Sequence, residues 1–519
     1  MRSLAAAAIL CAATTPLLAQ HDHPAPMRLG TVRFPTSCSA AAQPDFTMGV
    51  ALLHSFAFSF ADSAFARALR ADPDCAMAWW GLSLDAWANP MAAGIKPAGQ
   101  VQRGLAAVQR ARTTGRPTER ERGYIEAVAH LYERADSLPQ RARLAAYRDA
   151  MDALARQQPA DTEAVIFAAL ARAAAADPGD KSYADQLAAG AVLERLWAAQ
   201  PDHPGLAHYI IHAYDVPPLA ARAESAAARY AVIAPSVSHA LHMPSHTYTR
   251  VGQWQQSIAS NIAAGNAARS EGATAELLHA MDYRMYAYLQ LGRYREAREV
   301  LDSAPVIAAR LASTTVVTAA APASGYFGAA AIEARWVLER GQWADAARLE
   351  VRPNPTPYAE ALTWFARGLG AARSGDTTSP AASMAELARL RDLLSQRGDA
   401  YWSEQVEIQR RGVEAWRNFA AGRRNEALDG IREAADREAA TEKAAVTPGP
   451  LAPARELQGE MLMAAGRPGE ALSAFELTLQ HEPNRRRALA GAQQAAQASG
   501  DSAKARDYAE RVRRLTAGP

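Results

Sequence analysis

Apolar residues recur every three or four positions along almost the whole chain after residue 45, which is the period of an amphipathic helix. Alanine, the best helix former, is abundant, glycines separate the periodic segments, and the alternation typical of strands is essentially missing. The pattern therefore predicts an all-α protein of helices joined by short glycine turns. With 519 residues, such a chain forms either several domains or one long array of repeats.

Two distant stretches share one spacing of small, large and aromatic residues. In residues 45–73 the spacing is carried by Gly49, Leu52, Ala61, Phe65, Ala68 and Pro73. In residues 452–483 it is carried by Gly459, Leu462, Gly466, Ala471, Phe475 and Pro483. Between them, "AYLQLGRYREA", "VLERGQWADAA" and "FAAGRRNEAL" contain the central helix–glycine–helix turn of the same unit.

This spacing resembles the tetratricopeptide repeat, TPR, a helix–turn–helix unit that stacks on its neighbours. The resemblance implies an α-solenoid wound into a right-handed superhelix, in which the first helix of each pair lines a concave groove. The block "HYIIHAYD…APSVSHALHMPSHTYTRVGQW" is also similar to one in a group of bacterial secreted repeat proteins. No activity follows from that second likeness.

The pattern divides the chain into four parts. Residues 1–19 combine Arg2, an apolar run and a small residue at Ala19, as a cleavable signal peptide does. We expect an extended segment at 20–44, the superhelix body with its groove at 45–445, and C-terminal repeats at 446–519, after the Pro/Gly-rich stretch 446–454. No later apolar run reaches the roughly 18 residues of a transmembrane helix, so we expect a periplasmic or secreted protein.

Signal cleavage would leave two cysteines, Cys38 and Cys75. In an oxidising compartment they can form one disulfide that ties the N-terminal segment to the first helices. The alternative is two separate thiols in apolar surroundings.

Charge and motifs argue against several functions. The 56 basic and 54 acidic residues nearly balance, so no large positive field is present to bind nucleic acid or an acidic membrane. The chain has no glycine-rich phosphate loop after a strand, no G-x-S-x-G elbow and no H-E-x-x-H motif. We therefore expect no nucleotide cofactor, serine hydrolysis or zincin proteolysis.

Histidines gather where the repeat frame can be drawn with most certainty. Pro201 and Pro235 lie 34 residues apart, one repeat length, and histidines recur at the same two frame positions in both repeats. By the resemblance to TPR proteins, those positions face the groove. The predicted metal ligands are His208, His212, His239, His242, His246 and, in the next repeat, His279 and Asp282.

Four more residues are candidate ligand-binding or second-sphere groups. His54 occupies a groove position in the first matched repeat, far from the others in sequence. Asp215 and Arg250 occupy groove positions close to the histidines, and Tyr248 lies beside them. Pro244 lies within the histidine block, so it either kinks the helix there or begins a new one.

The spacing favours a transition metal. Packed helices lie about 8–10 Å apart, and an imidazole nitrogen binds zinc at about 2.0–2.1 Å, so two facing H-x-x-x-H pairs can converge on one ion. Imidazole ligands suit zinc, copper, iron or nickel rather than calcium or magnesium. We expect one or two such ions, or a small polar ligand. The alternative is a ladder of structural histidines, duplicated with the repeat and held by hydrogen bonds.

Two functions follow from these alternatives. In the first, an exported TPR protein binds a transition metal or a small polar ligand through its groove histidines. In the second, the groove holds a peptide or protein partner, the common use of this fold, by analogy alone. A metal with three or four protein ligands can be structural or keep an open position, so the sequence leaves enzymatic activity undecided.

Overall fold

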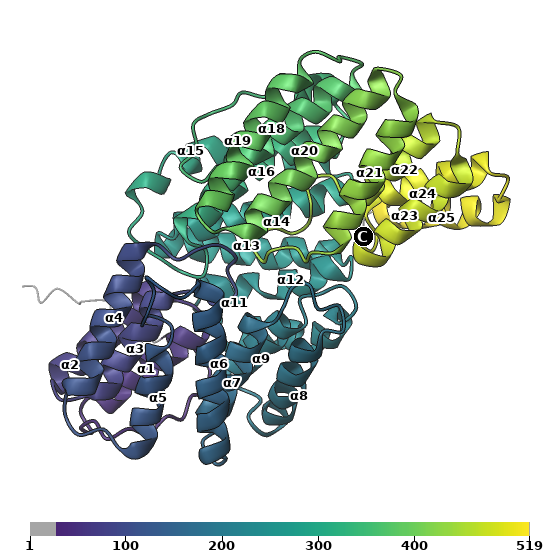
Figure 1. Cartoon of the computed structure of the whole chain (residues 1–519). Coiled ribbons are helices and arrows are strands. Elements are labelled where there is room, and N and C mark those ends of the chain that lie inside the picture. The colour runs from purple at the N-terminus through teal and green to yellow at the C-terminus, as the bar shows by residue number, and fades with distance from the viewer. Residues whose placement is uncertain (1–26, 518–519) are drawn as a thin grey trace, which may run out of the picture.

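The computed structural model describes residues 27–517 (Figure 1). The described residues form helices and connecting loops and contain no strand. The predicted signal peptide, residues 1–19, lies outside the described residues. None of the described helices has the length and apolar content needed to cross a bilayer.

The helices follow one another closely along the chain. The first group is α1 (Gln43–His54), α2 (Phe58–Ala71), α3 (Ala76–Trp87), α4 (Ala98–Thr113), α5 (Glu119–Ala129), α6 (Gln140–Gln157), α7 (Thr162–Ala175), α8 (Ala184–Ala199), α9 (Pro204–Ala213), η1 (Ala220–Ala223), α10 (Glu224–Ile233), α11 (Ser238–His242) and α12 (Pro244–Arg250). The second group is α13 (Trp254–Glu271), α14 (Thr274–Gln290), α15 (Tyr294–Ala308), η2 (Leu311–Ser313), α16 (Pro322–Leu338), α17 (Trp343–Ala346), α18 (Pro357–Arg373), α19 (Pro380–Gln396), α20 (Ala400–Ala420), α21 (Arg424–Ala439), α22 (Ala454–Ala464), α23 (Pro468–His481), α24 (Arg486–Ala498) and α25 (Ser502–Thr516).

Helices pack against their neighbours in chain order, as expected for a solenoid. Helix α1 packs on α2, α13 on α14, α20 on α21 and α23 on α24. Contacts also join alternate helices, such as α14 with α16 and α18 with α20, so each pair stacks on the next. Figure 1 shows this succession from the purple N-terminal helices to the yellow C-terminal ones. The predicted all-α solenoid of TPR-type helix pairs is confirmed.

The residues of the repeat motif pack in the same way at both ends of the solenoid. The Phe65 ring from α2 lies between Gly49 of α1 and Gly81 of α3, where a Cβ on either glycine would overlap it. The Phe475 ring from α23 lies in the same way between Gly459 of α22 and Gly491 of α24. Small residues thus let adjacent helix pairs close around one aromatic ring, as the sequence spacing predicts.

The N-terminal segment is held to the first helices. Cys38 and Cys75 form a disulfide with an S–S distance of 2.02 Å, which resolves the two alternatives in favour of pairing. The Phe34 ring packs within 5.4 Å of the Phe46 and Trp80 rings. Apolar burial and a covalent link therefore both fix the extended chain before α1.

Residues 441–453, between α21 and α22, run through the interior of the solenoid, and we call them the inner strap. Tyr283 on α14 donates to the carbonyl oxygens of Ala445 and Thr447, both at 3.2 Å. Arg335 on α16 donates to Thr447 Oγ1 at 2.8 Å and to the Gly449 carbonyl at 2.9 Å. The inner strap thus lies against helices from the middle of the chain.

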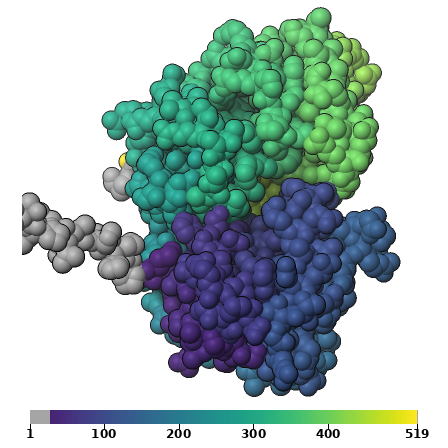
Figure 2. Space-filling view, turned by 90° about the vertical axis from the view of Figure 1, so that its left-hand side faces the viewer, coloured from purple at the N-terminus to yellow at the C-terminus, as the bar shows by residue number. Residues whose placement is uncertain are grey.

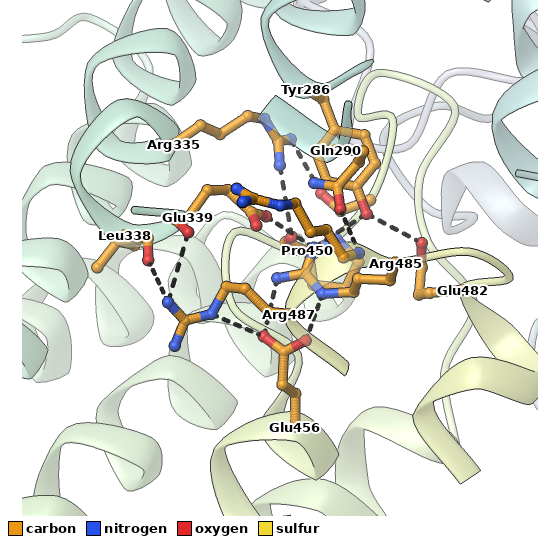
Figure 3. A network of polar contacts seen from close by, with 12 residues as sticks. Tyr286, Gln290, Arg335, Leu338, Glu339, Pro450, Glu456, Glu482, Arg485 and Arg487 are labelled. Atoms are coloured by element: carbon orange, nitrogen blue, oxygen red, sulfur yellow. Dashed lines mark hydrogen bonds and ion pairs between the residues drawn. The ribbon is translucent and has the colours of Figure 1, made fainter. Parts of the chain in front are cut away.

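A buried charge network joins the C-terminal helices to the middle of the chain (Figure 3). Arg485 forms ion pairs of 2.7 Å with Glu456 on α22 and with Glu339, next to the end of α16. Its guanidinium also donates to the Tyr286 hydroxyl on α14 at 3.0 Å. Because every hydrogen-bonding direction of the buried guanidinium must be met, this network specifies how α22 to α24 dock on α14 and α16.

Candidate metal centre

Six histidines meet where α9, α11, α12 and α14 come together, near the middle of Figure 1. Helix α9 supplies two, α11 two, and α12 and α14 one each. All six are buried, with exposures between 0% and 6%. Helix α14 adds to the site because it packs against α11 and α13. The six residues are His208, His212, His239, His242, His246 and His279.

His208, His212 and His239 form the first triad. One ring nitrogen from each lies within 4.8 Å of the other two. The Nε2 atoms of His208 and His239 are 3.2 Å apart, and the His208 ring centroid lies 4.8 Å from that of His212. Three nitrogens at this spacing can bind one transition-metal ion, given metal–nitrogen distances of about 2.0–2.1 Å.

His242, His246 and His279 form the second triad. Their ligand atoms also lie within 4.8 Å of one another. The Nε2 atoms of His242 and His246 are 3.0 Å apart, and the ring centroids of His242 and His279 are 4.4 Å apart. This group offers a second three-imidazole site with the same chemistry.

The two triads adjoin, but their grouping differs from the predicted pair of pairs. Ring centroids from different triads come within 6.0 Å for His239 and His242, and 6.1 Å for His212 and His246. Pro244 is the first residue of α12, so the block is two short helices rather than one. His239 and His242 both lie on α11 and point about 60° apart around its axis, so His239 joins α9 while His242 joins α12 and α14.

Hydrogen bonds fix the tautomers of four of these rings. In each, Nδ1 faces an oxygen that can only accept, so Nδ1 carries the proton. The four contacts are His208 with the His54 carbonyl (2.6 Å), His239 with Glu276 (3.2 Å), His242 with Asn261 Oδ1 (2.6 Å) and His246 with Asp215 (2.9 Å). The Asn261 amide is oriented because its Nδ2 donates to the Ser257 carbonyl at 2.8 Å. All four Nε2 atoms are thereby left as lone pairs.

The two carboxylates that accept these hydrogen bonds, Glu276 and Asp215, stay ionised in the fold. Burial acts to raise the pKa of Glu276, but the neighbouring His239 and His279 and the Thr318 hydroxyl together hold it at about 2. Burial also acts to raise the pKa of Asp215, while Lys443 and Arg250 together hold it well below its usual value. Both groups are therefore carboxylates that accept hydrogen bonds, as second-sphere partners of metal-bound histidines do.

Burial favours the neutral form of His208, His212, His242, His246 and His279. It lowers the pKa of His208, His212 and His242 well below the usual 6.5, with neighbouring histidines adding to the effect. It lowers the pKa of His279 to about 3. Two ring nitrogens, His212 Nε2 and His279 Nδ1, have no hydrogen-bond partner within residues 27–517. Neutral rings with free nitrogens are the form in which histidine binds metals.

The inner strap contributes a charge that sequence reasoning missed. Lys443 Nζ lies 3.3 Å from Asp215, which also receives the Arg250 guanidinium at 2.8 Å. The predicted groove residues Asp215 and Arg250 are therefore second-sphere groups behind His246. Tyr283, also missed, places its hydroxyl 3.4 Å from His246. Sequence reasoning also missed Glu276, although it lies one helical turn before His279 on the same helix.

Besides Asp215 and Arg250, three predicted residues lie outside both triads. Asp282 is buried in an ion pair with Arg335 at 2.7 Å, so its carboxylate is already taken. His54 joins His203 on the two oxygens of Glu163, at 2.9 and 3.0 Å, and supports His208 only through its carbonyl. Tyr248 is half-buried and forms no hydrogen bond with the six histidines in the described part of the chain.

A small chamber opens between the triads. Its volume is about 40 Å³, and its wall includes two histidines of each triad, namely His212, His239, His246 and His279. It shares Asn89, Ser324 and Tyr358 with an outer cavity of about 1000 Å³. Figure 2 shows the face on which the purple and blue N-terminal helices meet the green middle of the chain, whose residues form that outer cavity.

No family model matches the chain, and no curated protein matches its sequence. Among solved structures, it is similar to a human IFIT1 dimer with m7Gppp-AAAA at 12% identity and a TM-score of 0.36, over 85% of this chain and 90% of that one. It is similar to the P58(IPK) TPR domain at 11% identity and a TM-score of 0.23, over 89% of this chain and 99% of that one. It is similar to the APC/C hetero-tetramer Cut9-Hcn1 at 10% identity and a TM-score of 0.29, over 93% of this chain and 95% of that one. The fold assignment rests on the helix packing, and no function transfers at these values.

Proposed function

We propose that this chain is an exported TPR-type protein that binds two transition-metal ions, one in each histidine triad. Each ion would take three neutral imidazole nitrogens from two or three helices. The second-sphere contacts of Glu276, Asn261 and Asp215 would orient the rings. The fold itself supplies the rigid support that such a site needs.

One observation carries this proposal: lone pairs face each other inside the protein. With Nδ1 protonated on His208 and His239, their Nε2 lone pairs approach to 3.2 Å. The same holds for His242 and His246 at 3.0 Å. Two buried lone pairs at this distance repel unless a proton or a metal cation lies between them.

The alternative is a peptide-binding scaffold in which the histidines form a structural hydrogen-bond ladder. It requires a proton between each Nε2 pair, which would make one ring of each pair a cation. Burial opposes that charge on His208 and on His242, so in each pair the ladder would need it on the other ring, which faces Glu276 or Asp215. In addition, the inner strap already occupies the interior beside the second triad, where a peptide would have to bind.

Export is part of the proposal. Residues 1–19 have the pattern of a signal peptide, and the Cys38–Cys75 disulfide suits an oxidising compartment. Expression with the native N-terminus should yield mature protein in the periplasm or medium, detected by mass spectrometry of its N-terminus. A full-length cytosolic product would contradict this part of the proposal alone.

Metal content tests the proposal directly. Purified protein, dialysed separately against copper and zinc salts, should retain two ions of the metal it binds per chain by elemental analysis. His208→Ala should retain only the ion of the second triad, and His242→Ala only that of the first. His130→Ala, which removes an exposed histidine, is the control and should retain two. Wild-type protein that retains neither metal under any loading condition would refute the proposal.

A further inference from the structure

The chamber between the triads is shared by both candidate ions. Two histidines of each triad line it, while His208 and His242 do not. Each triad therefore has one ring away from the chamber and two rings beside it. An ion with three protein ligands keeps an open coordination position. In both triads that position would face the same small space.

The size of the chamber limits what can bind there. About 10–15 Å³ of such volume is needed to hold one water molecule, so about 40 Å³ accommodates roughly three or four atoms of that size. A two-atom ligand fits, whereas an aromatic ring or a sugar does not. A ligand that touches both ions must therefore be very small.

The charge around the site favours ions of low charge. All six ligands are imidazoles, which bind metals as neutral groups and add no negative charge. The nearby carboxylates are already engaged: Asp215 by Arg250 and Lys443, and Glu276 by His239 and the Thr318 hydroxyl. Two divalent ions would add four buried positive charges, and the cost of burying charge is severe. Among metals that imidazole binds well, copper alone is common as a singly charged ion.

We propose that the two ions are copper and that the reduced pair binds dioxygen in the chamber, an inference that rests on the proposed function. Each Cu(I) gives one electron to dioxygen, so that two Cu(I) and one O₂ become two Cu(II) bridged by peroxide. No proton is gained or lost. The summed charge of ions and ligand stays the same, so the low-dielectric interior does not oppose the step.

Dioxygen would reach the chamber from the outer cavity. Ser324, the third residue of α16, lines both spaces, so a bulky side chain there would block the passage between them. Its neighbour Ala323 lines only the outer cavity. The two positions therefore provide a matched pair, with the same substitution on the same helix and different expected results.

The test starts with protein loaded with Cu(I) without oxygen. Addition of dioxygen should consume one O₂ per chain at an oxygen electrode. The oxidised product should give no electron paramagnetic resonance signal, because two bridged Cu(II) ions couple. Ser324→Phe should still bind two copper ions but lose most of the rapid uptake, while Ala323→Phe should behave as wild type. Zinc-loaded protein should consume none.

The outcomes separate the two proposals. Protein that binds two copper ions but consumes no dioxygen, or that shows the full signal of two isolated Cu(II) ions, overturns this inference and leaves metal binding intact. Protein that binds no copper overturns this inference, and zinc binding then decides the proposed function. Unchanged uptake in Ser324→Phe, with two coppers bound, would overturn the chamber as the place of reaction.

Discussion

Asn261 shows how a residue outside the triads controls a metal ligand. It is fully buried, its amide is oriented by Ser257, and it accepts the His242 Nδ1 proton at 2.6 Å. Without that acceptor, the His242 ring can take the other tautomer or rotate. The Nε2 lone pair is then no longer held toward His246. The position of one oxygen thus determines which ring nitrogen is free.

We therefore expect Asn261→Leu to weaken binding at the second triad by about 10- to 100-fold, the usual effect of losing a second-sphere partner. The first triad should be unaffected. Competition with a chelator of known affinity measures both sites. Asn266→Leu, at an exposed position of the same helix, is the control. Equal affinities in wild type and Asn261→Leu would show that the hydrogen bond does not orient the ring.

Glu438, at the end of α21, predicts a pH dependence of stability that is independent of the metal centre. Burial raises its pKa to about 7, although the Ala454 amide donates to it at 2.7 Å. Between its usual value of 4.5 and about 7, the folded state binds this proton more tightly than the unfolded state does. The contribution to the free energy of unfolding is therefore full below about 4.5 and is lost as pH rises through about 7.

Urea unfolding at pH 5.5 and pH 8 tests this sign. Wild type should lose stability between the two values, and Glu438→Gln should lose less because the neutral amide does not titrate. Glu426→Gln, at an exposed position of α21, should keep the wild-type difference. A Glu438→Gln protein with an undiminished pH difference would assign the effect to other groups.

At the scale of helices, the fit of Phe65 between Gly49 and Gly81 predicts that a larger residue at Gly81 destabilises the fold. Gly81→Ala would press a methyl group into the ring, and overpacking of this kind costs about 1–3 kcal/mol. Gly99→Ala on α4 is the matched control, because the space around it is open and alanine favours a helix by up to about 1 kcal/mol. Urea unfolding should therefore show a lower free energy of unfolding for Gly81→Ala and a higher one for Gly99→Ala. A Gly81→Ala protein as stable as wild type would mean that the helices can move apart to make room for the methyl group.

The helices could largely be predicted from the sequence, and the grouping of the histidines could not. The repeat spacing indicated where helices pair and where small residues meet Phe65 and Phe475. The same frame placed the histidines on one wall, and Pro244 left open whether the block is one kinked helix or two. His239 and His242 both precede Pro244 on α11, and they point about 60° apart around its axis, so they meet different partners. A repeat frame gives the face on which a side chain lies, but not which neighbouring helix it meets there.

At the scale of the whole molecule, the second sphere of the site draws on distant parts of the chain. His54 comes from α1, Glu276 from α14 and Lys443 from the inner strap. A repeat frame predicts contacts between adjacent repeats, whereas these join segments up to 228 residues apart. The stretch around residues 446–454 reads as a linker from its proline and glycine content. In the fold it is packed against Tyr283 and Arg335.

Metal removal should therefore destabilise more than the site. A ligand that binds only the folded state adds about 2.7 kcal/mol when its free concentration is 100 times its Kd. Chelation should lower the melting temperature and increase hydrogen exchange in α9, α11, α12 and α14. Exchange in α25, at the far end of the solenoid, should change little. Identical exchange in these four helices with and without metal would contradict a structural coupling of the triads.

The path of the inner strap bears on how the protein acquires its ions. All six imidazoles belong to the first 279 residues, but Lys443, Ala445 and Val446, which lie over them, are synthesised much later. A chain that emerges N-terminus first can form α9 to α14 while this cover is still missing. Ions then have a wider entrance during maturation than the finished protein offers.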